Sequence, residues 1–320
     1  MAKLLPILFS CLLLTGCANE KPKPVNEESR SKNLAQTVPT FDGKNAFEYL
    51  TKQTDFGSRS PGSIAHSNCL AYLQSEMQKY AEAVNLQPFT HIGYDGKNIT
   101  MSNIISSFNI KSTTRILLLA HWDSRPRAEQ DKDQKKQNNA VLGANDGASG
   151  VAVLLEIARH MKSQPPSIGV DILFTDGEDY GKEGDLNNYF LGARYFANNL
   201  PPGFKPAFGI LLDMIGDSQL EIRKERFSLK YAPDVVDIVW STAKSLGVDQ
   251  FSDNVQGYVE DDHLSLNESG IKTIDLIDFN YPDESNRYWH TTKDTPDKCS
   301  SESLEAVGKV LMYVIYQYKP

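Results

Sequence analysis

The stretch RILLLAHWD, residues 115–123, decides the fold class of this chain. Its short apolar run is typical of a buried β-strand, and the run gives way at once to His121, Trp122 and Asp123. Three more short apolar runs with Gly or Asp boundaries predict strands at 170–174, 208–212 and 273–277. Helical segments are expected at 151–161, 189–199 and 235–246, after the first, second and third strands. This alternation predicts an α/β fold around a mostly parallel sheet.

Further elements are expected on both sides of this core. Helical periodicity predicts helices over 66–84 and 303–318, and the segment 99–107 is a candidate for an added antiparallel strand. Between residues 41 and 320 the sequence contains no internal repeat, low-complexity block or obvious domain break. One catalytic domain over residues 43–320 is therefore the simplest expectation.

Composition restricts the class of function. The chain has 320 residues, with 33 Lys and Arg against 41 Asp and Glu, and 40% of its residues are apolar. It is long enough and apolar enough to bury a full core. Its net charge of -8 argues against a protein that binds nucleic acid through the phosphate backbone, since such proteins concentrate Lys and Arg.

The amino terminus has the form of an export signal that ends at a cysteine. Lys3 precedes the apolar run 4–14, which is about half the length of a membrane-spanning helix, and Leu14-Thr15-Gly16-Cys17 follows. This segment resembles the lipobox of bacterial lipoproteins. The resemblance implies a signal peptide at 1–16, lipidation of Cys17 and a polar tether over 17–42. We therefore expect a lipid-anchored protein of the bacterial cell envelope that faces the periplasm, in the outer membrane.

Cys69 and Cys299 are the two cysteines that remain beyond the lipidation site. Two cysteines do not make a disulfide framework, and the sequence leaves open whether they pair or stay as buried thiols.

Polar residues gather where the predicted strands end. His121 follows the first strand, Glu178 and Asp179 follow the second, and Asp213 follows the third. Open α/β sheets bind ligands at the carboxyl ends of their strands, so these side chains are expected in one crevice. Each of these residues has a structural explanation of its own, as a turn residue or a solvated acid. The combination points to a polar site.

Catalytic zinc takes three or four N, O or S ligands and keeps one position open. Asp146, Asp179 and His290 would provide such a set. Asp146 could instead cap the helix that follows it. Adjacent side chains diverge, so Asp179 can ligate the metal while Glu178 faces the substrate as a general base.

Six motifs occur in a recognisable order between His121 and Thr291: HxDS, GANDxASG, DGE followed by an acid, LDMIG, DDH and WHT. An upstream segment, FGSRSPGS at 56–63, accompanies them. This order resembles the M28 metallopeptidase superfamily. The resemblance implies a three-layer α/β/α sandwich with a mixed, mostly parallel central sheet, and a zinc site.

Two activities share this framework. In the aminopeptidases of the superfamily, two zinc ions would be held by His121, Asp146, Asp179, Asp213 and His290, and Glu178 would activate water. Type II glutaminyl cyclases hold one zinc at the positions of Asp146, Asp179 and His290. There Glu178 would move protons, while Asp213 and Asp261 would form an acidic pair.

Local features favour the cyclases. The string EDDH at 260–263 and Trp289 directly before His290 are similar to the cyclases, which implies that Trp289 and His263 contact the substrate. The strings HWDSRP, GANDGASG and EDYG look like those of secreted cyclases of Bacteroidetes-type bacteria, although Arg127 stands where an aromatic residue is expected. The resemblance thus favours a monomeric, zinc-dependent glutaminyl-peptide cyclotransferase that acts on peptide and protein N-termini. A di-zinc aminopeptidase is the alternative.

Overall fold

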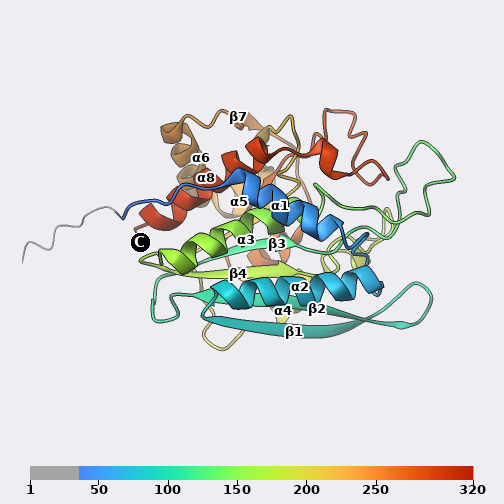
Figure 1. Cartoon of the computed structure of the whole chain (residues 1–320), viewed down its shortest axis with the longest axis horizontal. Helices are drawn as coiled ribbons and strands as arrows, with labels where there is room; N and C mark the ends of the chain where they lie inside the picture. The colour runs from blue at the N-terminus through green and yellow to red at the C-terminus, as the bar shows by residue number, and fades with distance from the viewer. Residues whose placement is uncertain (1–35, 320) are drawn as a thin grey trace, which may run out of the picture. The chain divides into compact units, whose positions relative to one another are not determined.

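The computed structural model describes residues 36–319, and its centre is a six-stranded sheet (Figure 1). The strand order is β1-β2-β4-β3-β5-β8. The strands are β1 (Ala83–Ile92), β2 (Asn98–Phe108), β3 (Arg115–His121), β4 (Gly169–Thr175), β5 (Gly209–Asp213) and β8 (Thr273–Ile277). The β3, β4, β5 and β8 strands are parallel, whereas β2 runs antiparallel to both β1 and β4. The sheet is therefore mixed and mostly parallel, as predicted.

Alternate residues of each central strand face opposite layers. Ile116 and Leu118 of β3 point into the larger apolar core, whereas Leu117 and Leu119 point into a second core on the other face. Each of these leucines is fully buried, which contributes about 1.5–3 kcal/mol per side chain. A strand buried on both faces requires apolar residues at every position, and this explains the continuous run in the sequence.

Helices cover both faces of the sheet. The larger core is closed by α1 (Gly43–Thr54), α2 (Ile64–Tyr80), α3 (Ala148–Ser163), α6 (Pro233–Leu246) and α8 (Ser301–Gln317). On the other face, α4 (Leu191–Asn198) and α7 (Asp262–Glu268) contribute Phe196 and Leu266. The three-layer α/β/α sandwich is thereby confirmed.

Several predicted boundaries need correction. The helix predicted over 66–84 ends at Tyr80, because residues from Ala83 onward pair with β2 as the edge strand β1. The helix predicted at 151–161 starts earlier, at Ala148. The helices α1 and α7 were not predicted. Five short elements were not predicted either: η2 (Leu186–Asn188), β6 (Ile222–Lys224), α5 (Arg226–Tyr231), β7 (Phe251–Val255) and η3 (Pro296–Lys298).

The structure answers the question of the two cysteines. Cys69 on α2 and Cys299 after η3 are both buried and free, so they do not form a disulfide. The predicted signal peptide 1–16 and Cys17 lie outside the described residues. Within residues 36–319, no helix is both long enough and apolar enough to cross a membrane.

Candidate active site

The carboxyl ends of the parallel strands carry the predicted site residues. His121 is the last residue of β3 and Asp213 the last residue of β5, while β4 leads directly into the loop that holds Glu178 and Asp179. Asp146 lies just before α3. Because these strands are parallel, their ends meet at one edge of the sheet, where open α/β sheets bind ligands.

Gly147 brings Asp146 to this edge. Its φ is +100°, a value that L side chains rarely adopt, and a Cβ at this position would lie 2.2 Å from the backbone oxygen of Asp123. Only glycine fits this approach between the α3 amino terminus and the loop after β3. The alternative role of Asp146 as a helix cap is excluded, because α3 has Gly147 as its N-cap and no side-chain capping bond.

Asp146, Asp179 and His290 come together as a potential metal-binding group. One ligand atom from each lies within 4.8 Å of the others, and all three residues are buried. The Nε2 atom of His290 is 3.3 Å from Oδ1 of Asp179 and 3.7 Å from Oδ2 of Asp146. Oδ2 of Asp179 is buried without a hydrogen-bond partner among the described residues. Two carboxylates, one of which has this unpartnered oxygen, and one imidazole fit a zinc ion.

The charges at this group also favour a cation. Burial raises the pKa of Asp146, and the neighbouring Asp179 raises it further. For Asp179 burial would also raise the pKa, but Arg125 and His290 outweigh it and hold the pKa well below its ordinary value. Asp179 is therefore ionised beside a second carboxylate, and a bound cation would remove their repulsion.

Other side chains hold these residues in place. Arg125 Nη1 donates to Oδ1 of Asp179 at 2.5 Å. The Asp294 carboxylate accepts hydrogen bonds from the backbone N–H groups of Asn145 and Asp146, at 2.9 and 3.2 Å. Tyr281 donates its hydroxyl to the same carboxylate at 2.8 Å. Such outer contacts fix the orientation of metal ligands.

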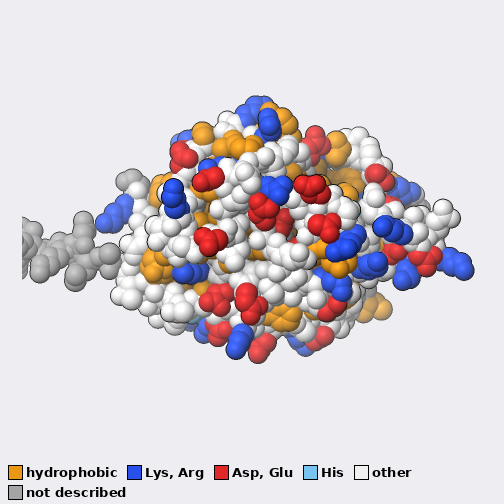
Figure 2. Space-filling model, turned by 90° about the horizontal axis from the view of Figure 1, so that it is seen from above, with side chains coloured by type: hydrophobic (Ala, Val, Ile, Leu, Met, Phe, Trp, Pro, Cys, Tyr) orange, Lys and Arg blue, Asp and Glu red, His pale blue; other side chains and the backbone are white. Residues whose placement is uncertain are grey.

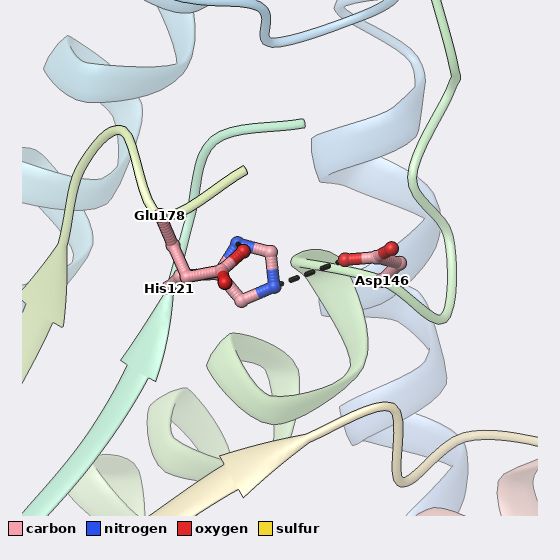
Figure 3. Close-up of side chains that lie close together, drawn as sticks. All are labelled: His121, Asp146 and Glu178. Atoms are coloured by element: carbon pink, nitrogen blue, oxygen red, sulfur yellow. Dashed lines mark ion pairs between the residues drawn. The ribbon is translucent and has the colours of Figure 1, made fainter. Parts of the chain in front are cut away.

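A second potential metal-binding group contains His121, Asp146 and Glu178 (Figure 3). The Nε2 atom of His121 lies 3.2 Å from Oδ1 of Asp146 and 3.2 Å from Oδ1 of Asp213. Burial alone would lower the pKa of His121, but Asp123, Asp146 and Asp213 raise it well above its ordinary value. The surrounding carboxylates therefore favour positive charge at this position, either a proton on the imidazole or a metal ion bound to it. This second group includes Glu178, whereas the sequence predicted His121 and Asp213 as the additional ligands of a second metal.

Glu178 has the environment of a proton-transferring group. Its N–H donates to Oδ1 of Asp123 at 3.1 Å, which fixes the loop, while its own carboxyl group lines the cavity. Burial raises its pKa well above the ordinary value, and although His121 opposes this shift, Asp179 and Asp261 add to it. A raised pKa lets a carboxyl group both accept and return a proton near neutral pH.

Asp213 and Asp261 line the same cavity but contact different groups. Oδ1 of Asp213 is bonded to His121, and Oδ1 of Asp261 accepts from the N–H of Asp262. Oδ2 of Asp261 is buried without a partner among residues 36–319. Burial and then Asp213 raise the pKa of Asp261 well above its ordinary value. Asp261 is therefore neutral and can donate a hydrogen bond.

The cavity has a volume of about 280 Å³. Its acidic lining consists of Asp146, Glu178, Asp179, Glu183, Asp213, Glu260 and Asp261. Trp289 forms part of the apolar wall and stacks on His290, with the ring centroids 3.6 Å apart. Among the described residues, no Lys or Arg lines the cavity. This lining suits a small cationic group that carries a short side chain.

The prediction that His263 contacts the substrate is wrong. It is fully buried, does not line the cavity and has Glu225 as its ion-pair neighbour at 3.5 Å. It follows Asp261 on the first turn of α7, so its ring points into the protein interior instead of toward a substrate.

The sequence interpretation assigned no role to four residues that hold the site. These are Arg59, Asp123, Arg125 and Asp294. Arg59 is fully buried and donates to the backbone oxygens of Trp122, Leu142 and Gly143. Arg59 and Arg125 lie within the quoted motifs FGSRSPGS and HWDSRP, which were the available signal. Arg127 does not line the cavity; it donates to the backbone oxygens of Tyr180 and Gly181.

Residues 103–315 match the model of the family described as peptidase family M28. The chain belongs to this family. The matched segment contains every site residue described above except Arg59.

Solved structures of M28-like proteins have the same fold. The glutaminyl cyclase of Bacteroides thetaiotaomicron, bound to N-acetylhistamine, is 40% identical, covers 88% of this chain and 100% of its own, and has a TM-score of 0.84. A leucine aminopeptidase precursor from the same species is also 40% identical, covers 88% of this chain and 99% of its own, and has a TM-score of 0.85. The glutaminyl-peptide cyclotransferase of Boiga dendrophila is 24% identical over 81% of this chain and 76% of its own length.

Proposed function

We propose that this protein is a zinc-dependent glutaminyl-peptide cyclotransferase. It converts the N-terminal glutamine of peptides and proteins to pyroglutamate and releases ammonia. The observation that carries the proposal is the acidic cavity in which Glu178 and Asp261, both with raised pKa values, lie beside the Asp146, Asp179 and His290 group. The glutaminyl cyclase relatives add support.

One zinc ion would be held by Asp146, Asp179 and His290, and would polarise the γ-carboxamide carbonyl of the substrate. Trp289 packs against the glutamine side chain, while the acids of the cavity attract the α-ammonium group. After the α-ammonium group releases one proton to solvent, the resulting amine lies against the carbonyl carbon, so that ring closure is intramolecular.

Glu178 carries the proton through the reaction. It accepts a proton from the attacking α-amine as the new N–C bond forms. It then returns this proton to the amide nitrogen as the old C–N bond breaks, and ammonia leaves. Neutral Asp261 donates a hydrogen bond to the substrate from the cavity wall, which helps to hold the amide in the reacting orientation.

The replacement Glu178→Gln tests this role. We expect turnover of a Gln-peptide to fall by about a thousandfold or more, because Gln cannot accept the proton. Zinc content should stay unchanged, since Asp146, Asp179 and His290 are intact. Ammonia release and zinc per chain, determined on the same sample, measure both quantities. Loss of zinc in this variant would contradict the role given to Glu178.

A di-zinc aminopeptidase is the second candidate, and the His121, Asp146 and Glu178 group favours it. The leucine aminopeptidase precursor adds support. The two candidates differ in product and in metal count. Incubation with Gln-peptides and with aminoacyl-amides separates them: ammonia with about one zinc per chain supports the cyclase, and free amino acid with two zinc ions supports the peptidase.

The location is part of the proposal. The run 4–14 followed by Cys17 supports an exported lipoprotein of the bacterial cell envelope that faces the periplasm. Labelling of cells with a radioactive fatty acid should label the wild-type chain but not a Cys17→Ser variant. Equal labelling of both chains would exclude this anchor.

A further inference from the structure

A second cavity adjoins the active site. It has a volume of about 300 Å³ and is lined in part by Gln130, Asp131, Lys132, Arg287, Trp289 and Lys293; we call it the basic groove. Gln130 and Trp289 line both this groove and the active-site cavity. The two spaces are therefore neighbours across the Trp289 side chain.

The groove is formed where two loops are held together. The Asp131 carboxylate accepts hydrogen bonds from the Thr292 hydroxyl at 2.6 Å and from the Thr292 N–H at 3.2 Å. The N–H of Gln130 donates to the backbone oxygen of His290 at 3.3 Å. These contacts fix the 125–138 loop against the loop that carries Trp289 and His290. The groove is thus preformed and has a fixed position relative to the predicted metal ligand.

Two of the three acids in the 125–138 loop, Glu129 and Asp131, already have partners within the protein. Glu129 pairs with Arg125 at 2.7 Å and with Arg127 at 3.0 Å. Asp131 is 5% exposed, and its oxygens accept from Thr292 and from the N–H of Asp133. Asp133 is exposed but does not line the groove, so Asp131 is the one acid of this loop that lies at the groove.

Two of the three cations of the groove are free to bind a ligand. Lys132 and Lys293 are exposed and have no ion-pair partner within residues 36–319. Arg287 is half-exposed and pairs with Asp283 at 3.2 Å. Figure 2 shows Lys and Arg side chains gathered at the end of the molecule where these loops lie in Figure 1. Among the described lining residues, Lys132 and Lys293 are unpaired cations and Asp131 is the one carboxylate, so the groove has a net positive charge.

The active-site cavity has the opposite charge. Seven acidic residues and no Lys or Arg of the described chain line it, and Glu183 and Glu260 at its rim are exposed. A peptide that leaves the cavity past Glu183 or Glu260 meets negative charge, whereas one that leaves past Trp289 enters the basic groove. Electrostatic complementarity therefore favours a substrate that is positive at its N-terminus and negative a few residues later.

We propose that the basic groove binds an Asp or Glu side chain of the peptide substrate, downstream of its N-terminal glutamine, through Lys132 and Lys293. This inference rests on the proposed cyclase function. It names a substrate class, N-terminal Gln-peptides with an acidic residue within the first few positions, and two specificity-determining residues.

Peptide amides that begin with Gln and carry Glu, Ala or Lys at position 2, 3 or 4 test the inference with the purified full chain. At low ionic strength, we expect kcat/KM for the best Glu peptide to exceed that of its Ala counterpart by about threefold to tenfold, the range of one or two exposed ion pairs. The kcat/KM of the Lys peptide should be lower than that of the Ala peptide. The Glu preference should decrease with added salt, because salt screens exposed charges.

Two charge-reversal variants locate the effect. The double variant Lys132→Glu/Lys293→Glu should lose the Glu-to-Ala ratio of kcat/KM or invert it. Lys135→Glu/Lys136→Glu is the matched control, because these exposed lysines lie in the same loop but do not line the groove. The control should keep the wild-type ratio. An equal loss of the ratio in both variants would mean that the preference comes from the overall positive charge of the loop. That result would overturn the proposal that the basic groove binds the acidic side chain.

A minimal substrate separates this inference from the proposed function. Glutaminyl 2-naphthylamide has no residue that could reach the groove. If the wild-type chain does not cyclise it or any Gln-peptide, the proposed function fails and the inference fails with it. If the chain cyclises it but shows the same kcat/KM for Glu, Ala and Lys peptides, the groove inference alone is overturned.

Discussion

Arg125 is the residue on which the position of Asp179 depends most directly. It is 1% exposed, and its guanidinium donates to the Asp179 carboxylate, to the Tyr189 hydroxyl and to Glu129. A guanidinium can make these bonds at once because its five N–H groups have a fixed planar geometry. The carboxylate that would bind zinc is thus held before any metal arrives.

The replacement Arg125→Lys should weaken zinc binding by about tenfold to a hundredfold, the usual cost of losing such a supporting contact. An ammonium group keeps the charge but cannot reach Asp179, Tyr189 and Glu129 together. Competition with a chelator of known affinity measures the change. Arg127→Lys is the control, because Arg127 contacts the same loop through the backbone oxygens of Tyr180 and Gly181 and touches no predicted ligand. Equal losses in both variants would mean that loop order matters, not the contact to Asp179.

At the scale of elements, the amino terminus of α3 links the sheet to the site. Gly147 lets the chain turn between Asp146 and the helix while passing close to the backbone oxygen of Asp123. The two loops can approach only because residue 147 has no Cβ. The helix start therefore determines where Asp146 lies relative to His121.

We expect Gly147→Ala to lower the free energy of unfolding by at least about 3 kcal/mol, because it adds a backbone clash to an unfavourable φ. The control Gly96→Ala, in the turn between β1 and β2, also has a positive φ but meets no atom within 4 Å. Gly96→Ala should lower the free energy of unfolding by only about 1–2 kcal/mol. Urea denaturation of both variants tests the difference. Similar losses would exclude the close approach to Asp123 as the cause.

How well each strand could be predicted from the sequence depends on how deeply it is buried. The strands β3, β4, β5 and β8 were predicted to within a residue or two, because burial on both faces demands continuous apolar runs. The edge strand β1 is largely exposed and was assigned in part to a helix, since it has no such run. The residue types that bind zinc, together with the resemblance to the M28 motifs, also placed Asp146, Asp179 and His290 at one site.

The supporting residues could not be predicted in the same way. Asp294 binds the N–H of Asn145 across 149 positions of sequence, and Arg125 contacts Asp179 across 54. Such contacts depend on tertiary packing: the motif that contains Arg125 marks the residue but not its partner, and Asp294 lies in no quoted motif. His263 illustrates the converse error: it follows Asp261 closely in sequence, but the turn of α7 directs it into the interior.

At the scale of the whole molecule, a cluster of buried acids lies behind the active-site wall. Asp275 on β8 is fully buried, and neither of its carboxyl oxygens has a hydrogen-bond partner among the described residues. Burial raises the pKa of Asp275 well above its ordinary value, and Asp261 and Asp213 raise it further. Burial likewise raises the pKa of Asp262 to about 7. The folded protein therefore holds protons that the unfolded chain releases.

This difference fixes the sign of the pH dependence. Between the ordinary pKa of an unfolded Asp, 3.8, and the raised folded value, the native state binds more protons than the unfolded state, so stability falls as pH rises. Each such proton contributes a slope of about 1.4 kcal/mol per pH unit in that window. The variant Asp275→Asn tests this pH dependence, because its neutral amide does not titrate and the variant therefore lacks one of these folded-state protons. The free energy of unfolding should then fall less steeply from pH 5 to 8, and the variant should be more stable than wild type at pH 8. Denaturation at several pH values measures both slopes, with the exposed Asp249→Asn as a control that should keep the wild-type slope. An unchanged slope in Asp275→Asn would mean that Asp275 does not hold a proton in the folded protein.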